Sequence, residues 1–299
     1  MTDWIYFVLI AELIWAFTSL IDKIMLSKNY IKSPFVFIIF NGLMNILLVF
    51  LLPFFSFGSL SNMDIFISLL AGIFLTLGII LYYKAVQCEE ISRVLILWQL
   101  TPIFVLVMSY LFLSEFLTKN YFIGFIFLFA AGLIVSYKKI NGSFKLSKAF
   151  YFMIGSTLLI SVYYVLSKHI YSITSFWSAF MWLRVAALSS LLLLFFSSIR
   201  NQFISTWREM RKGIKSLITF KMIFDFSAFI ILGFAILNGP ISLISALGSA
   251  TAPIFIFIIT LLTTLYVPHL VKEDVDKKTV LTKIAAIVLI IVGIIFVTL

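Results

Sequence analysis

The chain has 299 residues, of which 63% are hydrophobic and 11% are charged, and its mean hydropathy is +1.18. A soluble domain has roughly 45–50% apolar and about 25% charged residues, so this composition excludes an ordinary soluble domain and indicates a bilayer protein. The net charge of +10 does not indicate nucleic-acid binding, because the basic residues lie between apolar runs and form no compact motif.

Ten apolar runs approach the roughly 20 residues that a membrane span requires. In chain order, we predict helices over residues 4–26, 33–55, 64–86, 91–113, 120–137, 149–168, 174–197, 219–238, 241–265 and 280–299. Most connections are short, so consecutive helices should be antiparallel neighbours. The longest polar connection, RNQFISTWREMRKGIKS at 200–216, is predicted to hold a short amphipathic helix at the membrane interface.

The basic residues are concentrated in alternate connections. With their flanks, the five odd-numbered loops hold 19 of the 22 lysines and arginines. The even-numbered loops hold only Lys119 and Lys168, and Arg184 lies inside the seventh span. Because cytoplasmic loops carry the excess of positive charge, we predict that the odd loops are cytoplasmic and that both termini lie on the other side of a cytoplasmic membrane.

The charge pattern also divides the chain into two halves. In residues 1–140 the basic loops are the first and third, whereas in residues 146–299 they are the second and fourth. An odd number of spans per repeat inverts the second copy, which moves the charges to different loops in this way. Weak sequence matches agree, such as ISRVLILWQLTPIF with ISLISALGSATAPIF. We therefore predict an all-α membrane protein with ten transmembrane helices in two inverted five-helix repeats.

The stretch PIFVLVMSYLFLSEFLTKNYFIGFIFLFAAGLIV at 102–135 carries a resemblance to a known family. Its proline, Glu115, Leu-Thr pair, Gly124 and Gly132 resemble the hallmark of EamA-type ten-span members of the drug/metabolite transporter superfamily. The resemblance implies a transporter fold for the whole chain and says little about the substrate. The second half departs from it, because a longer charged loop at 267–282 replaces the short glutamate-containing turn. The family's usual orientation places both termini inside, whereas the charges here predict the reverse, and we follow the charges.

Glu12 lies inside the apolar run FVLIAELIWAF, about 4–5 Å from the middle of the first span. A charge at this depth costs roughly 2.5–3.5 kcal/mol, so we expect Glu12 to face protein or a water-filled cavity. Ser19 lies on the same helical face, and Trp15 flanks it. The run AELIWA also resembles the first helix of small multidrug resistance transporters, which implies that Glu12 binds protons or a cationic substrate. The alternative is a structural carboxylate that pairs with Arg184 or is hydrogen-bonded across helices.

Two further charges lie deep in predicted spans. Arg184 has no polar neighbour within four positions, so its partner must come from another helix, and Asp225 in the eighth span is one candidate for a structural pair. Lys84 and Lys221 lie near span ends, and we expect their ammonium groups to extend to the interface.

Pro102 and Pro253 occupy equivalent positions in the fourth and ninth spans and should bend them. One interpretation is that these helices simply pack closely. The other is that they line a cavity, to which Trp98 would provide a stacking surface and Gln99 a hydrogen-bonding group. Tyr163 and Tyr164 in the sixth span are weaker candidates for the same cavity.

These observations favour a secondary transporter that moves a small cationic or zwitterionic metabolite, such as an amine or amino acid, by alternating access and with possible proton coupling. The predicted substrate-binding or coupling residues are Glu12, Trp15, Ser19, Trp98, Gln99, Arg184 and Asp225. A sugar or nucleotide-conjugate transporter and a non-transporting assembly subunit are the alternatives. We expect no enzyme activity, no cofactor, no metal and no nucleic-acid partner, and either a monomer or a homodimer. No GxxxxGK[ST] motif is present, so ATP does not drive transport directly.

Overall fold

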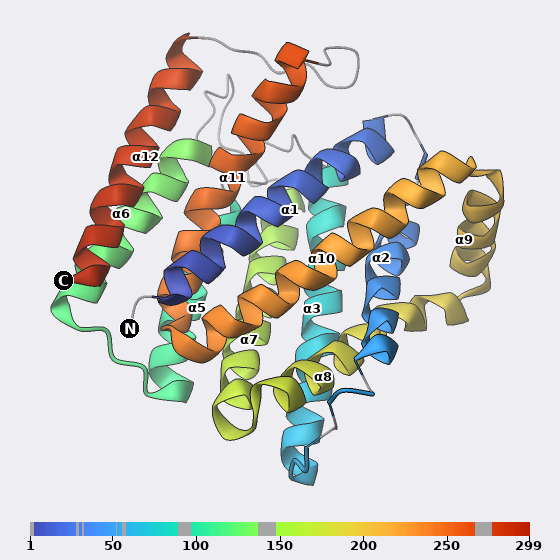
Figure 1. The fold of residues 1–299 in the computed structure, drawn as a ribbon, viewed down its shortest axis with the longest axis horizontal. Helices are drawn as coiled ribbons and strands as arrows, with labels where there is room; N and C mark the ends of the chain where they lie inside the picture. Colours follow the sequence, from blue (N-terminus) through green and yellow to red (C-terminus); the bar gives the residue numbers. More distant parts are fainter. Residues whose placement is uncertain are drawn as a thin grey trace.

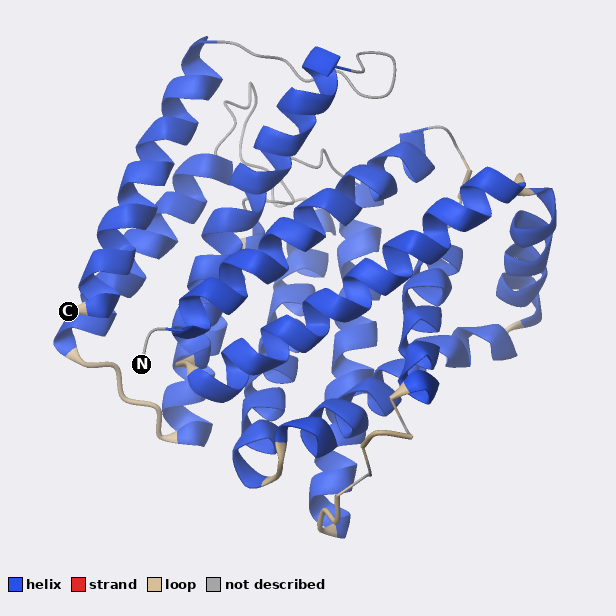
Figure 2. Ribbon diagram, viewed as in Figure 1, coloured by secondary structure: helices blue, strands red, loops and turns tan. Residues whose placement is uncertain are grey.

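The computed structural model describes residues 3–27, 30–31, 33–51, 53–55, 58–88, 97–136, 148–266 and 277–299. Within these ranges Figure 2 shows helices joined by loops and turns, which confirms the prediction of an all-α protein for this part of the chain. The elements are α1 (Asp3–Ser27), α2 (Pro34–Leu43), the 3-10 helix η1 (Met44–Phe50), α3 (Asn62–Cys88), α5 (Leu100–Leu113), α6 (Lys119–Ser136), α7 (Lys148–Ile173), α8 (Phe176–Ala187), the 3-10 helix η2 (Leu188–Phe195), α9 (Ser197–Glu209), α10 (Lys212–Asn238), α11 (Ile241–Tyr266) and α12 (Lys277–Thr298).

Six helical segments in the described ranges are long and apolar enough to cross a membrane. They are Asp3–Asp22, Asn62–Ala85, Lys148–Ile173, Phe176–Phe195, Lys212–Asn238 and Ile241–Thr263. Four shorter apolar helices cover Phe35–Leu48, Leu100–Leu113, Lys119–Ile134 and Ile284–Thr298. Every predicted span thus coincides with an apolar helix, although the start of span 91–113 and most of the loop at 267–282 lie outside the described residues. A separate helix, α9, forms where the 200–216 connection was predicted to hold one.

The second and seventh predicted spans are helical but are not α-helical throughout, because each changes to a 3-10 helix in its second part. At each change a polar side chain donates a hydrogen bond to the carbonyl group three residues back. Asn45 Nδ2 donates to Gly42 O at 3.1 Å, and Ser190 Oγ donates to Ala187 O at 3.1 Å. Local bonds of this kind compete with the regular helical ladder, which explains why the apolar pattern alone did not predict the change.

Helices of the first half pack mainly against helices of the second half. The helix α1 contacts α10 and α11, α7 contacts α3 and α5, and α6 contacts α12. In Figure 1, α1 and α10 run side by side, α6 lies beside α12, and both termini lie near the same end of the molecule. The largest buried core lies between these helices and includes Val8, Ala11, Leu183, Ala228 and Leu247 of α1, α8, α10 and α11.

Two close helix contacts depend on glycine. A Cβ atom at Gly72 in α3 would lie 2.2 Å from the carbonyl carbon and oxygen of Ala186 in α8. A Cβ atom at Gly124 in α6 would lie 2.5 Å from Val297 Cγ2 and 2.9 Å from the Gly293 carbonyl oxygen in α12. Small residues allow membrane helices to approach this closely, and these glycines therefore set the separations of α3 from α8 and of α6 from α12.

We expect Gly72→Ala to lower the free energy of unfolding by about 1–3 kcal/mol, because the added methyl group collides with backbone atoms of α8 that cannot rotate away. Gly213→Ala in the first turn of α10 is the matched control, since nothing lies within 4 Å of its Cβ position. Thermal unfolding of the purified proteins in one detergent compares the variants with the parent. Equal stability of Gly72→Ala and the parent would show that α3 and α8 are not in such close contact.

Candidate functional site

Arg184 in α8 is buried, with 2% of its surface exposed. Its Nη2 donates a hydrogen bond to the Tyr163 hydroxyl at 2.7 Å, and its guanidinium carbon lies 4.0 Å from the ring centroid of Phe229. Its Nε and Nη1 atoms are also buried and have no hydrogen-bond partner. Among the described residues no carboxylate pairs with Arg184, so Asp225, which was one candidate for its partner, does not take that role. The guanidinium group therefore has two nitrogen atoms, Nε and Nη1, free to donate to an anion.

Glu12 in α1 is also buried, with 9% exposed. Its carboxylate lies against α11 at Gly248, where a Cβ atom would come within 2.7 Å of Glu12 Oε1. The next residue of α11, Ser249, accepts a hydrogen bond through its carbonyl oxygen from Gln99 Nε2 at 3.2 Å. The small residues of α11 thus bring Glu12 and Gln99 to neighbouring positions. No ion pair with Glu12 forms within the described ranges, so the predicted structural pair with Arg184 is absent there.

Aromatic rings connect Glu12 to Arg184. Trp15 packs edge-on against Phe229, with ring centroids 5.1 Å apart, and Arg184 stacks on the same Phe229 ring. The rings of Tyr163 and Tyr164 lie 5.8 Å apart, and Tyr164 interacts electrostatically with Glu12. We call these six residues the Glu12–Arg184 cluster; they are Glu12, Trp15, Tyr163, Tyr164, Arg184 and Phe229. Phe229 was not predicted, because a phenylalanine in an apolar helix carries no signal that separates it from ordinary packing.

The predicted site residues Trp98 and Ser19 do not belong to this cluster. Trp98 packs against Tyr82 of α3, with ring centroids 5.0 Å apart, in a separate apolar group with Met153. Ser19 is half-buried, and it is the preceding residue, Thr18, that makes the contact with α10 described next. Helical periodicity placed Ser19 on the same face as Glu12, whereas the hydrogen bond to α10 comes from its neighbour Thr18.

Asp225 belongs to a second group of charges, in which it contacts Lys221. The Lys221 ammonium group also donates to Asn41 Oδ1 at 2.9 Å and lies 3.3 Å from Asp22 Oδ1, while Thr18 Oγ1 donates to Asp225 Oδ1 at 2.6 Å. Lys221 is 6% exposed, so the prediction that it extends to the interface is wrong. Lys84, by contrast, is exposed. We call Asp22, Lys221 and Asp225, together with Thr18 and Asn41, the α1–α10 charge cluster.

The other end of α10 is held by Lys168 of α7. Its Nζ donates to the carbonyl oxygens of Ile236, Leu237 and Gly239 at 2.6, 3.2 and 2.9 Å, which satisfies carbonyl groups left free at the end of the helix. Glu115, in the turn between α5 and α6, lies near Lys168. Burial raises the pKa of the Glu115 carboxyl, although the Lys168 charge opposes this effect.

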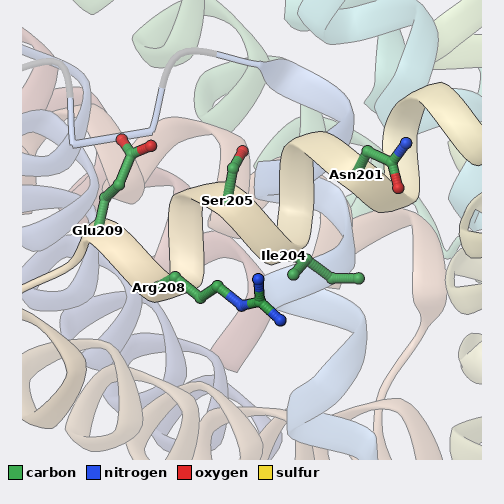
Figure 3. A pocket seen from close by; sticks show the side chains of 5 residues that line it. All are labelled: Asn201, Ile204, Ser205, Arg208 and Glu209. Atoms are coloured by element: carbon green, nitrogen blue, oxygen red, sulfur yellow. The ribbon is translucent and has the colours of Figure 1, made fainter.

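No group of three or more metal-ligating side chains occurs among the described residues. A shallow hollow of about 320 Å³ is lined by Asn201, Ile204, Ser205, Arg208 and Glu209, all on α9 (Figure 3). Because one helix provides the whole lining, this hollow lies at the surface and is separate from the two buried clusters.

Comparisons with known proteins agree with the fold. The sequence profile of the EamA-like transporter family matches residues 2–137. No curated protein matches the sequence. Among the solved structures, 29 chains match. One crystal structure superposes with a TM-score of 0.68 over 100% of this chain and 97% of its own length, at 17% sequence identity. At that identity, the likeness shows a shared fold alone.

We expect Lys221→Met to lower the free energy of unfolding by roughly 3–5 kcal/mol, because it leaves Asp22 and Asp225 buried without their counter-charge. Lys84→Met is the control and should change stability by less than about 0.5 kcal/mol, since Lys84 is exposed. Thermal unfolding in detergent measures both variants. The triple variant Asp22→Asn, Lys221→Met, Asp225→Asn should recover most of the loss. A Lys221→Met protein as stable as the parent would contradict the ion pairing described here.

Proposed function

Residues 2–137 place this chain in the EamA-like transporter family, and from that premise we propose that it carries a small zwitterionic solute across a cytoplasmic membrane by alternating access. The family consists of membrane transporters and not of enzymes, so the chain is a multi-pass membrane transporter.

We propose that residues 1–140 and 146–299 are two inverted five-helix repeats, with ten spans in total. The helix contacts support this arrangement, because they occur in corresponding pairs. The contact of α1 with α10 corresponds to that of α7 with α3, and the contact of α1 with α11 corresponds to that of α7 with α5. The change from α- to 3-10 helix also occurs in corresponding spans. The Glu12–Arg184 cluster then lies between the repeats, where transporters of this kind bind their substrates.

The observation that carries the proposed solute class is that two ionisable groups of opposite sign are buried without charged partners. Arg184 has two unpartnered nitrogen atoms, and Glu12 has no ion pair within the described ranges. A buried unpaired charge is costly, and a bound counter-ion removes that cost. A solute with both a carboxylate and an ammonium group would compensate both side chains, whereas a simple amine or a simple acid would compensate one of them.

The remaining residues of the cluster suit the body of such a solute. Trp15 and Phe229 provide aromatic surface next to Arg184, and Gln99 lies close to Glu12 through the Gly248–Ser249 segment. A nucleotide or sugar-phosphate conjugate would bring at least two negative charges, and Arg184 is the one cation of this cluster, so this alternative has less support. An amino acid is therefore the solute class that we propose.

We expect a zwitterion to raise the unfolding temperature of the purified protein more than its matched amine or acid does. A suitable set is leucine, isoamylamine and isocaproate, with phenylalanine, phenethylamine and phenylpropionate as a second set.

Loss of a charge-assisted hydrogen bond costs about 1.5–3 kcal/mol, so Arg184→Gln should weaken zwitterion binding roughly 10- to 150-fold and leave amine binding nearly unchanged. Glu12→Gln should have the opposite selectivity. Equal responses to all members of both sets, in the parent and the variants, would reject the proposed solute class.

The proposed orientation places the odd loops in the cytoplasm and both termini outside, because 19 of the 22 basic residues lie on the odd loops and their flanks. We expect a reporter fused after Leu299 to be active only outside the cytoplasm, and a tag inserted within residues 200–216 to be protected from external protease. A reporter that is active only in the cytoplasm would reverse the orientation and leave the proposed solute class unchanged.

A further inference from the structure

The α1–α10 charge cluster contains more negative than positive charge. Lys221 has three N–H donors, and three acceptors surround it: Asn41 Oδ1, Asp225 Oδ2 and Asp22 Oδ1. Two carboxylates therefore share one ammonium group, which leaves a net charge of −1 when both are ionised. The acceptors come from α1, α2 and α10. A buried excess charge of this kind is relieved most directly by binding one proton.

The two carboxylates are not equivalent. Both oxygens of Asp225 accept hydrogen bonds, one from Thr18 and one from Lys221, and these bonds favour the ionised form. Asp22 Oδ1 lies 3.3 Å from Lys221, a longer contact than the one that Asp225 makes, and this buried oxygen has no hydrogen bond of regular geometry. Asp22 is thus the carboxylate that loses least when it is neutralised. Its side chain is 26% exposed, and it lies at the end of the candidate span Asp3–Asp22.

The groups that face Asp22 from the packed helices do not compensate its charge further. On α10 these are Lys221 and Asp225, whose charges cancel each other, and on α3 they are Tyr82 and Tyr83. Both phenols interact electrostatically with Asp22 and are uncharged acids at neutral pH. Asp22 therefore remains the natural site for the additional proton.

We propose that Asp22 is a proton-binding site, separate from the Glu12–Arg184 cluster, and that its protonation loosens the contact between α1 and α10. In the ionised state Asp22 ties α1 to Lys221 of α10. A proton taken from water neutralises Asp22, and Lys221 then remains paired with Asp225 on its own helix. The bond from Thr18 to Asp225 is the polar tie from α1 that remains in this cluster.

The same two helices carry the proposed substrate site, which links the proton to the solute. The helix α1 holds both Asp22 and Glu12, about 15 Å apart along its axis. The helix α10 holds Lys221, Asp225 and Phe229 at successive four-residue intervals, on one face. A movement of α1 against α10 that separates Asp22 from Lys221 also shifts Trp15 relative to Phe229. Proton binding and solute binding are then coupled through one helix pair.

The test measures the α1–α10 arrangement directly and needs no substrate. Nitroxide labels at Tyr6→Cys on α1 and Gly213→Cys on α10, in a Cys88→Ser background, report the distance between exposed positions of the two helices. Pulsed electron paramagnetic resonance would be recorded between about pH 5 and about pH 8, a range that covers a perturbed carboxyl group. We expect two distance populations that exchange with pH in the parent. In Asp22→Asn the low-pH population should persist at every pH.

Three further variants establish whether Asp22 is the carboxylate that binds the proton. Asp64→Asn, which alters a carboxylate on α3 that contacts His169, and Glu12→Gln should both retain the pH-dependent exchange of the parent. Asp22→Glu keeps a titratable group and should retain the exchange with a shifted midpoint, which decides the matter if Asp22→Asn does not fold. A parent distance that does not change with pH, or a change that persists in Asp22→Asn, would overturn the proposal. Neither result affects the solute selectivity measured for Arg184 and Glu12.

Discussion

The contact between α1 and α10 depends on the ion pairs that the Lys221 ammonium group makes with Asp22 and Asp225. The ammonium group lies between carboxylates of both helices and also bonds to Asn41 of α2, so three helices meet at one buried cation. In a low-dielectric interior such a charge is tolerated only when its donors are satisfied, and this requirement fixes how α1 lies along α10. The depth of Glu12 on α1 and the position of Phe229 on α10 follow from that alignment, and the candidate substrate site depends on both.

The two buried clusters differ in whether their charged groups form ion pairs. The α1–α10 charge cluster provides its own counter-charge, and its charged groups bridge the halves of the chain. The Glu12–Arg184 cluster holds one charge of each sign on separate helices and joins them through aromatic rings, without an ion pair. The α1–α10 charge cluster is suited to hold helices together, because its charges compensate one another. The Glu12–Arg184 cluster is suited to accept a charged solute, because its charged groups lack such partners.

The helices were predictable from the sequence because the apolar runs are long, and Glu12, Trp15 and Arg184 were identified because polar groups in such runs are rare. The partners of the charges were not predicted. Asp225 was one candidate partner for Arg184, yet Lys221 lies four residues from Asp225 on the same helix and pairs with it instead. That spacing was visible in the sequence, but the position of Lys221 near a span end favoured an exposed side chain. The role of Phe229 depends on which helix faces α8, which one sequence does not specify.

The 3-10 segments alter how far the second and seventh spans can reach. A 3-10 helix rises about 2.0 Å per residue, against about 1.5 Å in an α-helix. The 10 residues of α2 and the 7 of η1 therefore extend about 29 Å, whereas one continuous α-helix of that length would extend about 26 Å. The hydrocarbon layer is about 30 Å thick. Because its second part is wound more tightly and rises further per residue, this segment comes close to crossing the layer with about three fewer residues than an ordinary span of about 20, at the cost of weaker hydrogen-bond geometry along that part of the helix.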